Sequence, residues 1–282
     1  MNKLLTILFS LLTITSGYGQ EQQDLSGIIN KIQAINELQY ENVGIDGAAS
    51  DNFKNYLELK HKANTEQLIK LTDNPNAVVT CYASWALIDR SFNDLPSILI
   101  KFLNKDRDVS TFRGCIKSTN PLSSEFYHRY WNSIDEKLRP TNKTLFTLDS
   151  LILYDDKSYW LLTLRALEDR VYPTSFNKRI EYLAFTKANK DAITYLQNLH
   201  DKTYDEKIKQ ALIKYLQQTN FSDVGVSPYF ETVSELLKYN DEKLKDLVIV
   251  KLKNDTFWTM NEERFLSLLK EYNIQTADIK RL

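Results

Sequence analysis

The side chains best suited to nucleophilic or metal chemistry are few and widely spaced in this 282-residue chain. Its three histidines, His61, His128 and His200, fall in different predicted helical segments, and none lies beside a Gly-x-Ser-x-Gly turn. The sequence contains neither a His-Glu-x-x-His nor a Cys-x-x-Cys motif. It therefore predicts no nucleophilic triad, no zinc site and no Gly-rich phosphate loop, and we expect no catalytic residue, metal or cofactor.

Paired carboxylates are the remaining acid–base chemistry, because glycoside hydrolysis uses two of them. The candidates are Asp149, Asp155, Asp156, Glu168 and Asp169. The repeated pairs Asp89-Arg90 and Asp169-Arg170 are typical of salt-bridged helix ends, and the chain is too short for a closed double ring of helix pairs. We therefore predict a protein that is not an enzyme. The alternative is a carbohydrate- or peptidoglycan-directed helical enzyme or binding protein.

Clustered aromatic residues are the most distinctive feature of the sequence. Aromatic side chains with arginines are favoured at binding interfaces, because they bury a large area at low entropic cost. The first cluster occupies positions 126–131, and six adjacent positions cover every side of a helix. Core packing and a binding groove are therefore both possible roles for it. The candidate binding residues are Phe126, Tyr127, Arg129, Tyr130, Trp131, Tyr154 and Tyr159, with Arg139 beside them.

The elements that position these residues are helices. Seven Gly and six Pro are far fewer than an all-β chain needs for its turns. Apolar residues at spacings of three and four predict amphipathic helices almost throughout. Between them, 40–50 is predicted to be a loop. Ser50 or Asp51 is predicted to cap a helix that runs to Lys62, with Phe53, Tyr56 and Leu57 facing inward. Thr65 is predicted to begin a capping box for the next helix.

A helix-turn-helix unit recurs along the chain. Shifting the sequence by 80 residues aligns 67–90 with 147–170 at six identical positions, and a looser copy covers 233–253. One helix pair cannot bury its apolar face alone, whereas stacked pairs form a continuous core. The repeat favours an all-α solenoid of stacked antiparallel helix pairs over a non-repetitive bundle. We expect an N-terminal helix and Gly-containing loop over 20–50 and a HEAT-like repeat domain over 51–282.

The N-terminus has the features of a secretory signal peptide. Lys3 precedes an apolar run from Leu4 to Thr15, and small residues precede Gln20. The run is too short to span a bilayer, so we predict a signal peptide over 1–19, cleavage after Gly19 and an exported, periplasmic or extracellular protein without a membrane span. In an oxidising compartment Cys81 and Cys115 could form a disulfide; two buried free thiols are the alternative.

Part of the sequence resembles a family of exported bacterial proteins with HEAT-type repeats. The resemblance covers about a quarter of the chain, and Thr80 stands where HEAT repeats often have an arginine. It implies fold and export, and no activity. It is carried by Tyr40, Val43-Gly44, Gly47, Ser50, Tyr56, Ala63-Asn64, Glu66, Leu68, Leu71-Thr72, Asn76, Val78-Val79, Tyr82-Ala83, Ala86-Leu87 and Gly114-Cys115.

The balance of charge limits the class of macromolecule that the protein is expected to bind. With 36 basic and 37 acidic residues, the formal net charge is −1. That balance excludes a strongly basic nucleic-acid binder. The sequence therefore predicts an exported, non-catalytic helical-repeat scaffold that binds a macromolecule through one face. The partner we expect is another protein of the cell envelope or exterior.

Overall fold

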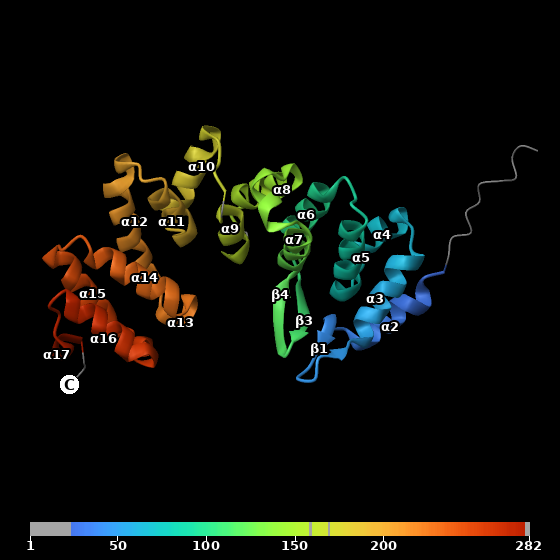
Figure 1. Ribbon diagram of the computed structural model, residues 1–282, viewed down its shortest axis with the longest axis horizontal. Coiled ribbons are helices and arrows are strands. Elements are labelled where there is room, and N and C mark those ends of the chain that lie inside the picture. Colours follow the sequence, from blue (N-terminus) through green and yellow to red (C-terminus); the bar gives the residue numbers. More distant parts are fainter. Residues whose placement is uncertain (1–23, 158–159, 169, 280–282) are drawn as a thin grey trace, which may run out of the picture. The chain divides into compact units, whose positions relative to one another are not determined.

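The computed structural model describes residues 24–157, 160–168 and 170–279. The predicted signal peptide therefore lies outside the described residues. The chain is mostly helical, as predicted, and it divides into two compact units, the first ending at Arg139 and the second beginning at Pro140 (Figure 1). The predicted boundary at residue 50 falls inside the first unit, because α2 packs against α3 and α5.

The first unit combines six helices among its described residues with a four-stranded sheet (Figure 1). Its helices are α2 (Ser26–Ile35), α3 (Asp51–Lys62), α4 (Thr65–Leu71), α5 (Ala77–Asp89), α6 (Leu95–Asn104) and α7 (Leu122–Ser133). Its strands are β1 (Leu38–Val43), β2 (Ala48–Ala49), β3 (Asp108–Gly114) and β4 (Ile116–Pro121). A 3₁₀ turn, Glu136–Thr141, follows α7.

The sheet was not predicted, and it corrects the loop expected over 40–50. The strand order is β2-β1-β3-β4, with β1 parallel to β3 and the other two pairs antiparallel. Tyr82 of α5 fixes β1 in place, since its hydroxyl accepts from Gln39 N at 3.0 Å and donates to Gln39 O at 2.8 Å. Gly114, at a left-handed φ of 54°, allows the tight turn into β4.

Helix α5 is the centre of the first unit. Every residue from Val78 to Ile88 is buried, and the helix contacts α2, α3, α4, α6, α7, β1 and β3. Asn76 caps it by accepting from the backbone N–H groups of Val78 and Val79. This helix is the second of the predicted helix-turn-helix unit 67–90, and because it is apolar all round it lies at the centre of the unit instead of exposing one face.

Local details of the neighbouring helices differ from expectation by small amounts. Ser50 caps α3 as predicted, with Tyr56 inward, but Leu57 is 43% exposed and Leu59 is buried instead. The capping box of α4 begins at Asn64 rather than Thr65, and its reciprocal partner is Gln67. Both differences are shifts of one or two positions along the helix.

The second unit is built from short helices that pack mainly on their neighbours in sequence. They are α8 (Lys143–Tyr154), α9 (Trp160–Leu167), α10 (Asn177–Glu181), α11 (Lys190–Asn198), α12 (Asp205–Gln218), α13 (Phe221–Val224), α14 (Val226–Leu237), α15 (Glu242–Asn254), α16 (Glu262–Glu271) and α17 (Thr276–Ile279). Short 3₁₀ turns connect some of them, at Thr174–Phe176, Lys202–Tyr204 and Thr256–Asn261, and a π-helical turn covers Tyr182–Thr186. The predicted pairs 147–170 and 233–253 correspond to α8 with α9 and α14 with α15, and α11 and α12 form a further adjacent pair.

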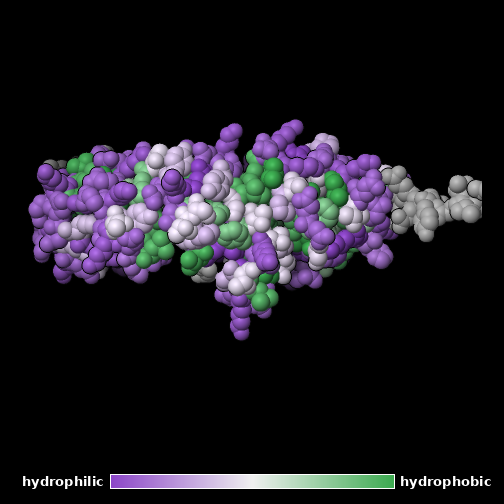
Figure 2. All heavy atoms as spheres, turned by 90° about the horizontal axis from the view of Figure 1, so that it is seen from above, coloured by the Kyte–Doolittle hydropathy of each residue, from purple (hydrophilic) through white to green (hydrophobic). Residues whose placement is uncertain are grey.

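The surface is mainly polar. Figure 2 shows a face that is mostly hydrophilic, with separate small apolar spots rather than one broad apolar patch. Among the described residues no helix has the length and apolar character needed to cross a bilayer.

Candidate functional site

Two of the predicted binding aromatics are core residues. Phe126 and Tyr127 of α7 are both 0% exposed, and the Phe126 ring packs edge-on against Phe102 at 5.7 Å. Core packing, the alternative left open for this cluster, applies to these two side chains. They cannot contact a partner at the surface of the folded chain.

Arg129 is held in place by a half-buried carboxylate. Its guanidinium donates to both oxygens of Asp89, with Nη2 at 2.8 Å from each, and stacks over the Trp85 ring at 5.0 Å. Tyr56 and Lys60 also donate to Asp89, at 2.5 and 2.8 Å. Burial alone would raise the pKa of Asp89, but these hydrogen bonds and the Arg129 charge hold it below its usual value. We call these five residues the Asp89 cluster.

The other predicted aromatics are partly accessible. Tyr130 and Trp131 are half-buried, and Arg139 stacks on the Trp131 ring at 3.3 Å from its centroid. In the second unit Tyr154 is 57% exposed at the end of α8, with the Arg179 guanidinium 5.6 Å from its ring. Tyr159 lies outside the described residues.

The two cysteines are free thiols in the structure. Cys81 is buried in the middle of α5, whereas Cys115 is exposed in the turn between β3 and β4, where its thiol lies 3.5 Å from Gly44 O. The proposed disulfide is therefore not formed, and the alternative of two buried thiols holds for Cys81 alone.

The candidate acid–base carboxylates have structural partners instead. Asp149 is buried and lies 2.7 Å from Arg170 Nε, and Asp156 pairs with Arg179 at 2.6 Å. Glu168 pairs with Arg165, the Asp155 carboxylate accepts from Lys157 N at 3.2 Å, and Asp169 lies outside the described residues. The described part of the chain also brings together no group of three His, Cys, Asp or Glu side chains that could bind a metal.

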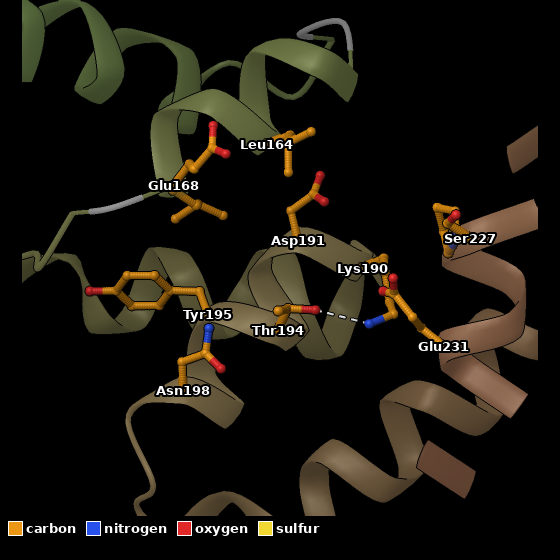
Figure 3. Close-up of a pocket in the computed structure, with 11 residues that line it drawn as sticks. Leu164, Glu168, Lys190, Asp191, Thr194, Tyr195, Asn198, Ser227 and Glu231 are labelled. Carbon is orange, nitrogen blue, oxygen red and sulfur yellow. Dashed lines mark hydrogen bonds between the residues drawn. The ribbon is translucent and has the colours of Figure 1, made fainter. Parts of the chain in front are cut away.

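A different set of charged residues lines a pocket of about 400 Å³ in the second unit. Three helices form its walls: Leu164 and Leu167 come from α9, Lys190 and Asp191 from α11, and Glu231 from α14. Figure 3 shows the Asp191 carboxylate pointing from α11 toward α9, while the Lys190 ammonium turns to the Thr194 hydroxyl. We call this site the Lys190 pocket.

An unusual backbone segment positions the two charges at the start of α11. The π-helical turn Tyr182–Thr186 is followed by Ala188 in a left-handed conformation, with φ at 51°. Asn189 then caps α11 by accepting from Ala192 N at 2.9 Å. Lys190 and Asp191 therefore occupy the first turn, where a carboxylate is favoured by the helix dipole but an ammonium is not. π-turns and left-handed residues other than glycine are concentrated at functional sites.

Both charges are half-buried and lack an ion pair. Lys190 Nζ donates to Thr194 Oγ1 at 2.9 Å, and this is its one hydrogen bond within the described residues. The Asp191 carboxylate has no hydrogen bond and no ion pair there. Buried polar groups are normally paired, because an unpaired one forfeits its hydration without compensation. The Lys190 pocket therefore has unused capacity to bind charged groups.

Desolvation favours the uncharged form of both residues and shifts their pKa values accordingly. Burial lowers the pKa of Lys190, against the opposing charges of Glu231, Glu235 and Asp191. Burial also raises the pKa of the Asp191 carboxyl to about 6, although Lys190 opposes this shift. Residues with such shifts that line a pocket are functional-site candidates on physical grounds. Chemically, the pocket can accept a cation at its carboxylates and a hydrogen-bond acceptor at Lys190.

No sequence motif marks this site. Lys190 and Asp191 look like solvated charges at a helix start, and the absence of partners is a property of the folded unit. A lysine in the first turn of a predicted helix was the one local irregularity that could have drawn attention.

Comparison with known protein families, with curated protein sequences and with solved structures finds no match to this chain.

Proposed function

We propose that this chain is an exported, non-catalytic helical-repeat scaffold whose Lys190 pocket binds another protein. In this proposal the helix pairs of the second unit are HEAT-like repeats stacked as a solenoid, and the first unit, with its sheet, is a specialised N-terminal part. The resemblance to exported repeat proteins supports the first point, and the sequential packing of α8 to α15 supports the second.

One observation carries the binding role. Two helices supply these charges to one pocket, Lys190 and Asp191 from α11 and Glu231 from α14, and none of the three has an ion pair among the described residues. A structural role would have paired them, as the Asp89 cluster pairs its charges. An unpaired set on a surface pocket is explained by a ligand that completes the pairing.

The same comparison favours binding over glycoside hydrolysis. Of the five carboxylates considered for hydrolysis, Asp149, Asp156 and Glu168 each pair with an arginine. Asp155 accepts a hydrogen bond from the Lys157 backbone, and Asp169 lies outside the described residues. A general acid or nucleophile must be able to reach its substrate. The carbohydrate-directed alternative would have to rely on the exposed Tyr154 ring as a sugar platform, without an adjacent free carboxylate pair.

The experiment is partner capture with the chain from Gln20 onward, immobilised and exposed to a detergent extract of its own cell envelope. The test variant is Lys190→Met with Asp191→Asn. The matched control is Lys243→Met with Asp246→Asn, which removes the same two charge types from the exposed side of α15. A second variant, Tyr130→Ala with Trp131→Ala, tests the surface predicted from the sequence.

We expect one enriched protein that the wild type and the α15 control retain and the pocket variant loses. Equal capture by the pocket variant would remove the Lys190 pocket from the proposal. Loss only in the Tyr130 and Trp131 variant would move the binding surface to α7. Retained glycan without protein would favour the carbohydrate-directed alternative.

A further inference from the structure

The unpaired charges of the Lys190 pocket specify what kind of group would satisfy them. Asp191 and Glu231 supply two carboxylates to the pocket and Lys190 supplies one ammonium, which gives the three a net charge of −1. Glu168 also lines the pocket, but Arg165 neutralises it. A complementary ligand therefore carries one net positive charge.

The ligand must also supply a hydrogen-bond acceptor. Lys190 Nζ uses one of its three N–H groups on Thr194, so two remain for a ligand oxygen. Lys190 and Asp191 are more than an ion-pair distance apart, because no ion pair forms between them in the described chain. A ligand with a cation next to an acceptor oxygen can bridge the two.

An apolar side chain would complete the fit. Leu164, Leu167 and Pro228 line the pocket together with the charges. Figure 3 shows Leu164 on the side of the pocket toward which Asp191 points. A ligand cation at Asp191 would therefore place any neighbouring side chain against α9, where contact with the leucines removes apolar surface from water.

Four common groups can be compared with these requirements. A carboxyl terminus would satisfy Lys190 but add negative charge to an already negative pocket. A lysine or arginine side chain would satisfy the carboxylates but offers Lys190 no acceptor. A free amino acid satisfies both but leaves the net charge uncompensated. A peptide amino terminus supplies an ammonium, an adjacent carbonyl oxygen and one net positive charge.

We propose that the Lys190 pocket binds the free amino terminus of a partner polypeptide whose first residue is apolar. The inference rests on the proposed function, since it names the part of the protein partner that enters the pocket. The α-ammonium donates to Asp191 and Glu231, the first peptide carbonyl accepts from Lys190, and the first side chain packs on Leu164, Leu167 and Pro228.

The test uses two pentapeptides that differ in one acetyl group. Each begins with leucine, continues with alanines and carries a fluorophore at an amidated carboxyl end; one has a free amino terminus and the other is acetylated. Binding to the chain from Gln20 onward is followed by fluorescence polarisation at pH 7.5. We expect the free peptide to bind with a Kd below about 1 mM and acetylation to weaken binding at least about tenfold.

Variants locate the effect. Asp191→Asn with Glu231→Gln should weaken the free peptide about tenfold and leave the acetylated peptide unchanged. The control Lys243→Met with Asp246→Asn should match the wild type. Circular dichroism of each variant shows whether it is folded before binding is measured.

Equal binding of both peptides, or no binding of the free peptide up to about 1 mM, would overturn the inference. Its failure is separable from failure of the proposed function. If envelope capture still depends on Lys190 and Asp191 while acetylation has no effect, the pocket binds a partner through some other group. If capture is also unaffected, both proposals fall.

Discussion

The Asp89 cluster of the first unit and the Lys190 pocket of the second contain the same kinds of side chain, but they differ in how their charges are satisfied. Asp89 accepts hydrogen bonds from Arg129, Tyr56 and Lys60. Asp191 accepts none within the described chain. A carboxylate with three donors stabilises its unit, whereas one without donors costs stability unless a ligand arrives. The comparison separates a structural charge cluster from the one that we propose binds a partner.

Breaking the Asp89 cluster should have the largest effect on stability. Asp89→Ala leaves Arg129, Lys60 and Tyr56 without their shared acceptor, so we expect the free energy of unfolding to fall by about 3 kcal/mol. Urea denaturation followed by tryptophan fluorescence measures it. Asp73→Ala is the control, because its pair with Lys101 is exposed, and it should change stability by less than about 0.5 kcal/mol. A decrease of less than about 1 kcal/mol in the free energy of unfolding of Asp89→Ala would show that the cluster does not have this structural role.

Removing the charge of Asp191 should act in the opposite direction. Asp191→Asn eliminates a desolvated carboxylate that has no hydrogen bond or ion pair among the described residues, so at pH 7 we expect stability to increase by about 1 kcal/mol. Urea denaturation is again the measurement, and Asp246→Asn on α15 should have no measurable effect. The same substitution should reduce partner capture. A variant that is less stable than the wild type would show that Asp191 has a structural partner after all.

The two carboxylates should also respond to pH with opposite signs. The pKa of Asp191 is raised to about 6, so its folded form binds a proton more tightly than the unfolded chain. Its contribution to stability therefore improves as pH falls from about 6 toward 3.8. The pKa of Asp89 is lowered, so the stability it supplies is present above 3.8 and is lost below it.

Urea midpoints between pH 7 and pH 3 test this contrast. The difference in urea midpoint between the wild type and Asp191→Asn should shrink as the pH falls below 6. The difference in urea midpoint between the wild type and Asp89→Asn should shrink only below pH 4. The other titratable groups around Lys190 and Asp191 are Glu168 beside α9, Tyr215 on α12, and Glu231 and Glu235 on α14. A pH step retained in Asp191→Asn would assign the titration to one of these.

The smallest effect concerns the backbone that positions the pocket. Ala188 is held at a φ of 51°, where a Cβ costs about 1 kcal/mol, so Ala188→Gly should stabilise the chain by up to that amount. Ala192→Gly, inside α11, should destabilise it by at least about 0.5 kcal/mol. Thermal denaturation compares the two. Equal destabilisation by both would mean that the left-handed turn is not strained.

The sequence predicted the helices well because their burial is periodic. Tyr56 in α3 and Leu148 in α8 are buried where a spacing of three and four places them. The sheet was missed because its strands carry many polar residues. In β3 only Val109 and Thr111 are buried, and β4 is exposed along most of its length, so no continuous alternation of apolar residues marks either strand.

The charges of the two sites could not be told apart by residue type. Asp89 and Asp191 both sit beside a basic residue on a predicted helix, and nothing in the adjacent sequence distinguishes them. What separates them is Arg129, forty positions from Asp89, and the absence of an equivalent donor near Asp191. Arg107 also makes its contacts with residues distant in sequence. It lies outside the predicted unit 67–90 and donates to Thr80 Oγ1 and to the Asn74 and Pro75 carbonyls.

The central position of α5 has a consequence for how the chain folds. It packs against α2, which ends at Ile35, and against α7, which begins at Leu122, and in the same unit the Tyr40 hydroxyl donates to Glu125, 85 positions along the chain. Contacts of such long range slow folding, because the loop-closure entropy is lost before the contacts form. The helices of the second unit pack on near neighbours and can form in sequence. We therefore expect the second unit to gain structure first, even though the ribosome makes it last.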